Sequence, residues 1–125
     1  MSVLGLDHVT IRVSDLTRSR RFYARALGLT EGARPPFKFP GAWLYAEGVA
    51  RVHLVAGRPI SGLETGAFDH VAFQGRDLPG TLARLERLGI AATQRRVPGR
   101  GQHQVFLRDP DGIRIELTFA ADDGE

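Results

Sequence analysis

The chain has 125 residues, of which 42% are hydrophobic and 25% charged, so we expect one globular domain spanning residues 1–125 and exclude intrinsic disorder. It contains no cysteine, which excludes a disulfide scaffold, a thiolate metal site and a cysteine nucleophile. The formal net charge is +3, but basic and acidic residues are interleaved and the N-terminal segment lacks a signal-peptide pattern, so we expect a cytoplasmic protein that binds neither nucleic acid nor membranes.

Short similarities at a nearly constant offset indicate two copies of one unit. An Asp-His-Val triplet at 7–9 recurs at 69–71, and a Leu-Gly pair at 27–28 recurs at 88–89. Near the end of each copy, Arg-Val-His-Leu at 51–54 corresponds to Arg-Ile-Glu-Leu at 114–117. We therefore expect a first unit near 1–57, a linker over 58–66 and a second unit near 67–121.

The first unit opens with alternating apolar and polar residues over 6–13, which predicts a strand. A helix follows, capped by Ser14 or Asp15, with Phe22, Ala26 and Leu27 on its apolar side and an end at Gly28. Three further strands are expected near 30–34, 42–47 and 50–56, with a tight turn at Gly48.

The second unit repeats this order. A strand is predicted over 68–74, then a helix that is capped by Asp77, carries Pro79 in its first turn and ends at Gly89. Leucines at 78, 82, 85 and 88 form the apolar stripe of this helix. Strands near 91–96, 103–108 and 113–119 complete the unit, so the predicted fold class is α+β with two tandem βαβββ units.

Four residues with metal-binding side chains occupy matched places in the two copies, within predicted strands. Burying such a polar side chain in an apolar strand costs free energy unless the side chain has a partner. Imidazole and carboxylate groups suit a divalent metal as that partner: zinc, nickel, cobalt, manganese or iron(II). If the copies pair by a pseudo-two-fold axis, the four side chains converge on one site, with one of the histidines, His53, as fourth ligand or outer partner. The expected metal-binding residues are His8, His53, His70 and Glu116. The remaining histidine, His103, is expected at an exposed loop edge.

The chain resembles the vicinal oxygen chelate superfamily, which includes glyoxalase I, fosfomycin-modifying enzymes, extradiol dioxygenases and bleomycin-resistance proteins. The resemblance spans nearly the whole chain and is carried by residues 6–9, 22–23 with 27–29, 68–71, and 106–112 leading into 115–117. It implies a cup-shaped mixed sheet around a metal held by the four residues above, and a homodimer. Residues 36–44 further resemble glyoxalase-I-like members of plants and bacteria.

The sequence departs from each of these relatives at some position. Glyoxalase I usually has a carboxylate at the place of His53, and the phosphonate-binding cluster of fosfomycin transferases is replaced by Arg96, Arg100 and Phe106. An extradiol dioxygenase uses a further histidine and tyrosine, for which the chain offers only His103 and either Tyr23 or Tyr45.

The expected function is that of a glyoxalase-I-like lyase or isomerase. Its metal would chelate two adjacent oxygens of a small substrate and stabilise an enediolate, while Glu116 moves the proton. Two alternatives stay open, an iron(II) dioxygenase and a metal-free small-molecule binding protein. Arginines beside the ligands favour an anionic or oxygen-rich substrate. The expected substrate-binding residues are Thr10, Arg12, Trp43, Arg51, Gln74, Gln104, Phe106 and Arg114.

Overall fold

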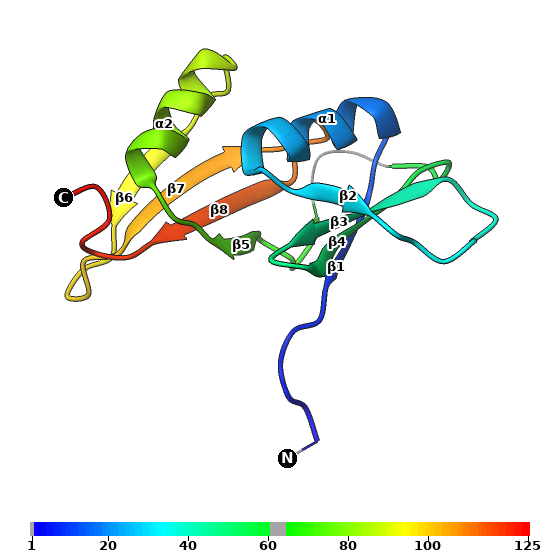
Figure 1. Ribbon diagram of the computed structural model, residues 1–125, viewed down its shortest axis with the longest axis horizontal. Coiled ribbons are helices and arrows are strands. Elements are labelled where there is room, and N and C mark those ends of the chain that lie inside the picture. Colours follow the sequence, from blue (N-terminus) through cyan, green and yellow to red (C-terminus); the bar gives the residue numbers. More distant parts are fainter. Residues whose placement is uncertain (1, 61–64) are drawn as a thin grey trace. The chain divides into compact units, whose positions relative to one another are not determined.

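The computed structural model describes residues 2–60 and 65–125 (Figure 1). The chain divides into two compact units, Met1–Gly62 and Leu63–Glu125, coloured blue to green and green to red. Residues 61–64 of the expected linker lie outside the described residues. No helix in the described part of the chain is long and apolar enough to cross a membrane.

The first unit is a four-stranded sheet with one helix, in the predicted βαβββ order. The strands lie in the order β1-β4-β3-β2, with β1 parallel to β4 and the other pairs antiparallel. The helix α1 contacts β2 and β3. The elements are β1 (Val9–Arg12), α1 (Leu16–Leu27), β2 (Thr30–Gly32), β3 (Gly41–Ala46) and β4 (Val49–Val55).

The second unit repeats the topology, with strand order β5-β8-β7-β6 and β5 parallel to β8. This confirms the α+β fold with two tandem βαβββ units. The elements are β5 (Val71–Gln74), α2 (Leu78–Arg87), β6 (Thr93–Arg96), β7 (His103–Arg108) and β8 (Arg114–Phe119).

The repeat extends to the register of the strands. In the parallel pairs, Val9 lies opposite Val52 and Val71 opposite Ile115, so the next residues of the last strands, His53 and Glu116, hold equivalent places. The adjacent strands match as well: Trp43 pairs with His53, and Phe106 pairs with Glu116. The two sheets therefore present equivalent positions, and two of these differ in kind: His53 corresponds to Glu116, and Trp43 to Phe106.

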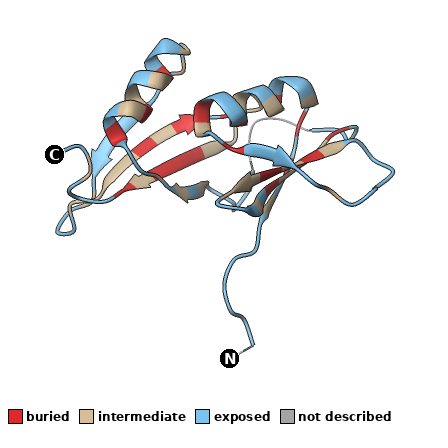
Figure 2. Cartoon of the chain, viewed as in Figure 1, coloured by how far each residue is buried: buried red, intermediate tan, exposed pale blue. Residues whose placement is uncertain are grey.

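Each unit has its own apolar core, built mainly on its two central strands (Figure 2). The buried stripe of α1 consists of Ser19, Tyr23 and Ala26, spaced four and three residues apart. The predicted apolar side was partly wrong: Phe22 and Leu27 are only half-buried, and the aromatic ring that enters the core is that of Tyr23. The helix places its small residues, Ser19 and Ala26, around this ring on its buried face.

The first strand of each unit begins later than predicted, so His8 and His70 precede β1 and β5 instead of lying within them. In the first unit, Nη1 of Arg51 donates to the backbone carbonyls of Leu6 and Asp7. These carbonyls are therefore satisfied by a guanidinium outside the ladder, and the strand pairing starts at Val9.

The helix caps agree with the sequence. Asp15 accepts a hydrogen bond from the Arg18 amide at the start of α1, and Gly28 ends that helix in the left-handed conformation. Asp77 caps α2 and accepts from the Gly80 amide. The left-handed φ of 68° at Asp77 is unusual for a residue other than glycine.

The C-terminal segment adds a second cap to α2, which the sequence did not predict. The Asp123 carboxylate accepts from the backbone amides of Asp77 and Leu78, at 2.9 and 2.7 Å. We expect Asp123→Ala to lower the free energy of unfolding by about 1 kcal/mol, as loss of a helix cap typically does. Thermal denaturation checks this against Asp122→Ala, which removes an exposed neighbouring carboxylate. Equal melting temperatures for the two variants would contradict the capping role.

Candidate metal and active site

In the second unit, His70 and Glu116 meet at the start of β5 and the middle of β8. The Nε2 atom of His70 lies 3.1 Å from Oε1 of Glu116. The other carboxylate oxygen, Oε2, accepts from the Thr118 hydroxyl at 2.6 Å and from the Gln104 amide at 3.2 Å. Glu116 is only 8% exposed. Its carboxylate is therefore fixed at one oxygen and directed toward the imidazole with the other.

A second carboxylate orients the same imidazole from behind. Nδ1 of His70 lies 2.6 Å from Oδ2 of Asp69, and that oxygen also accepts from Nη1 of Arg114 at 2.7 Å. The hydrogen bond with His70, and then the one with Arg114, hold the pKa of Asp69 below its usual value. An anionic Asp69 favours a proton on Nδ1, which leaves Nε2 as the nitrogen with a lone pair.

In the first unit, the equivalent place holds a stack of three rings. His53 lies between His8 and Trp43, with ring centroids 3.8 and 3.9 Å away and planes inclined by 14° and 10°. Nε2 of His53 is 3.2 Å from the carbonyl oxygen of Ala50. Burial, and then the neighbouring His8, lower the pKa of His53 below its usual value, so its imidazole is neutral near pH 7. A neutral imidazole is the form that ligates metals.

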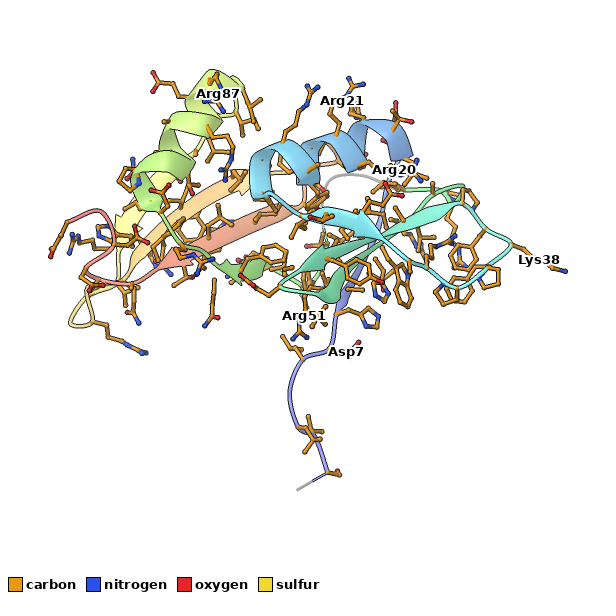
Figure 3. All side chains as sticks on the ribbon, viewed as in Figure 1. Asp7, Arg20, Arg21, Lys38, Arg51 and Arg87 are labelled. Atoms are coloured by element: carbon orange, nitrogen blue, oxygen red, sulfur yellow. The ribbon has the colours of Figure 1, made fainter. Side chains whose placement is uncertain are left out.

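His8 repeats the arrangement of His70. Its Nδ1 lies 2.8 Å from the carboxylate of Asp7, and this hydrogen bond is the main cause of a lowered Asp7 pKa. Figure 3 shows Asp7 and Arg51 together at the start of β1, where Arg51 binds the Asp7 carbonyl. The two Asp-His pairs thus present Nε2 in the same way.

The aspartates of these pairs were missed as functional candidates. A strand over 6–13 would place Asp7 and His8 on opposite faces, but the strand starts after both residues. The available signal was the Asp-His doublet itself, present at 7–8 and again at 69–70.

The expected substrate-binding residues divide into two groups. The first group contacts the donors or their neighbours. Arg51 and Arg114 contact the aspartates that precede the first strands, and Gln104 contacts Glu116. Trp43 stacks on His53, and Phe106 lies edge-on to His70, with the Arg114 guanidinium 4.5 Å from the centroid of the Phe106 ring. The exposed remainder, Thr10, Arg12 and Gln74, makes no contact with the donors in the described hydrogen bonds.

The position expected for His103 was wrong. It is the half-buried first residue of β7, and strand alternation places it on the face of Val105 and Leu107. Gln104 and Phe106 occupy the other face, with Glu116. The two tyrosines are also engaged elsewhere: Tyr23 is fully buried on α1, and the Tyr45 hydroxyl donates to the Ala33 carbonyl.

The sequence matches a known protein family. The profile of the Glyoxalase/Bleomycin resistance protein/Dioxygenase superfamily matches residues 5–117, which include all four expected donors. The chain belongs to this superfamily. It is 33% identical to a lactoylglutathione lyase of Haemophilus influenzae over 88% of each protein. It is 30% identical to Glyoxylase I 4 of Arabidopsis thaliana, over 94% of this chain and 71% of that protein.

Solved structures share this fold. A glyoxylase/bleomycin resistance protein/dioxygenase domain from Frankia superposes with a TM-score of 0.79 at 26% identity, covering 95% of this chain and 99% of that one. A mutant of the fosfomycin resistance protein FosX from Listeria monocytogenes, complexed with Mn(II) and a dihydroxypropylphosphonic acid, superposes with a TM-score of 0.76 at 19% identity. It covers 94% of this chain and 93% of that one.

The residues present suit a divalent metal. Two histidines have Nδ1 engaged by an aspartate, which is the outer-sphere arrangement common at metal sites. One carboxylate oxygen of Glu116 lies beside the exposed nitrogen of His70. Within residues 2–60 and 65–125, no three or more histidine, aspartate or glutamate side chains are arranged so that they could hold a metal ion, and each unit has its own donor pair.

Proposed function

We propose that this protein is a divalent-metal-dependent enzyme of the glyoxalase-I-like type, which isomerises or cleaves a small substrate bearing two adjacent oxygens. The observation that carries the proposal is the His70–Glu116 pair, with the imidazole anchored by Asp69 and the carboxylate anchored by Thr118 and Gln104. The identity to lactoylglutathione lyases supports the reaction class.

His70 and Glu116 would bind the metal, with His8 and His53 as the further ligands, and the active protein would be a homodimer. A divalent metal bound there would supply Lewis acidity toward the substrate oxygens. Nitrogen and oxygen donors suit nickel, cobalt, zinc, manganese and iron(II) alike, so the bound ion is identified by measuring which metal the protein holds.

Glu116 would carry the proton. Its Oε2 is held by two hydrogen bonds, so Oε1, the oxygen beside His70, would bind the metal and, once released from it, accept a proton from the substrate carbon and return it to the neighbouring carbon. Phe106 and the buried surroundings of Glu116 limit water around the carboxylate, which raises the strength of its electrostatic interactions. A transfer between adjacent carbons by one base is an isomerisation.

Iron(II)-dependent ring cleavage is less well supported by the side chains. The additional histidine available in sequence, His103, lies on the sheet face opposite Glu116. Tyr23 is fully buried, and the Tyr45 hydroxyl is bonded to the backbone. These residues leave the dioxygenase without the extra acid–base groups that such an enzyme uses.

The test is metal analysis followed by assay. Untagged protein is analysed by elemental mass spectrometry, stripped of metal, reloaded with each of the five ions and assayed on the hemithioacetal of methylglyoxal and glutathione. Near-stoichiometric metal and isomerisation support the proposal. Oxygen consumption with catechols in the iron(II) form would replace it by the dioxygenase, and absence of metal after reloading would leave a binding protein.

A further inference from the structure

The loop between β2 and β3 carries two phenylalanines that remain exposed although they are firmly arranged. Phe37 and Phe39 are 45% and 36% exposed, and their rings stack with centroids 5.1 Å apart and planes inclined by 15°. The Arg34 guanidinium lies 5.2 Å from the first ring and 4.9 Å from the second. Lys38, between them in sequence, points outward (Figure 3).

The loop is held by hydrogen bonds at both of its ends. Nη2 of Arg34 donates to the Phe39 carbonyl at 2.7 Å, and the Tyr45 hydroxyl donates to the Ala33 carbonyl. A Cβ at Gly41 would clash first with the backbone carbonyl oxygen of Leu54 and would also lie 3.0 Å from Nη2 of Arg34, so the glycine leaves room for both groups. The exposure of the two rings is therefore a fixed feature of the loop, and exposed apolar groups held in this way commonly mark a binding surface.

The two rings continue into the stack around the candidate metal ligands. The Phe37 centroid lies 6.4 Å from that of Trp43, at an angle of 47°. Trp43 stacks on His53, which stacks on His8. One unbroken row of aromatic rings thus leads from the exposed loop to two proposed metal ligands, all within the first unit.

We propose that the substrate carries an aromatic ring attached to its two chelating oxygens, and that this ring lies against Phe37 and Trp43. This inference rests on the proposed function: a metal held by His8 and His53 together with the other ligands would bind the two oxygens, and the adjoining substituent would then lie at the row of rings. Aromatic pairs with ring centroids about 4.5–7 Å apart bind more tightly than the area they bury accounts for. Phe37 and Trp43 are thus specificity residues for the substituent, while the metal ligands recognise the oxygens.

The test compares two ligands that chelate identically and differ only in the substituent: mandelate with a phenyl group and lactate with a methyl group. Binding to metal-loaded protein is followed by the fluorescence of Trp43, the only tryptophan of the chain. We expect mandelate to bind roughly tenfold more tightly than lactate, from stacking together with the buried apolar area. Phe37→Ala is expected to reduce the ratio to about twofold, with lactate affinity unchanged, whereas Phe37→Tyr and the neighbouring Lys38→Ala keep it.

Metal content, measured on the same samples, separates the possible failures. Occupied metal with equal affinities for mandelate and lactate overturns the aromatic substituent and leaves the proposed function intact. A ratio unchanged in Phe37→Ala overturns the role of the loop. Protein that takes up no metal overturns the proposed function, and this inference with it.

Discussion

Replacing Glu116 with glutamine is expected to lower kcat/KM for isomerisation by about 10²–10⁴-fold, the range associated with loss of a general acid–base group. Glutamine has nearly the same shape, and its amide oxygen still accepts from Thr118 and Gln104 at the place of Oε2. Its nitrogen faces His70 in place of Oε1 and cannot accept the substrate proton.

Steady-state kinetics with the methylglyoxal–glutathione hemithioacetal checks this result, beside the melting temperature and the metal content of each variant. Glu86→Gln, which alters an exposed carboxylate on α2, is the matched control and keeps wild-type kinetics. If Glu116→Gln retained full activity with its metal bound, Glu116 would not be the proton acceptor, and another group would have to take that role.

Asp69→Asn is expected to weaken metal binding by about 10–100-fold, the usual effect of removing an outer-sphere partner of a ligating histidine. The Asp69 carboxylate contacts both His70 and Arg114. Its charge favours the tautomer with Nε2 unprotonated, and an asparagine keeps the size of the side chain without the charge.

Asp7→Asn is the matched comparison, and its effect is expected to be smaller. The Asp7 side chain is 87% exposed, and Arg51 binds the carbonyl of that residue and not its carboxylate. Titration of metal-free protein with cobalt(II), followed by absorption, gives the affinity and reports the coordination geometry without reference to turnover. Equal losses in the two variants would show that the Arg114 contact adds nothing, and unchanged affinity in both would remove the aspartates from the site.

The repeated fold was predictable because its signals are local. Apolar alternation, the helix caps at Asp15 and Asp77, and the glycines that end the helices each act over a few residues. Matching these signals between the copies gave the βαβββ order and the equivalence of His53 with Glu116, which the strand register confirms.

Where the prediction failed, side chains distant in sequence decided the structure. Arg51 reaches the carbonyls of Leu6 and Asp7, 45 and 44 positions away, and keeps them out of the strand ladder. His103, expected at an exposed loop edge, is half-buried as the first residue of β7, where it pairs with Phe119 of β8. Alternation along one strand carries no information about either contact.

The equivalence of positions 53 and 116 also bears on how such proteins diversify. A duplicated unit begins with identical donors in its two halves, and here one half presents an imidazole where the other presents a carboxylate. Because the backbone register is the same, a single codon change at either position exchanges a nitrogen donor for an oxygen donor without altering the ladder. Substitutions at these two positions can therefore exchange nitrogen and oxygen donors, and so change the preferred ion, while the fold stays the same.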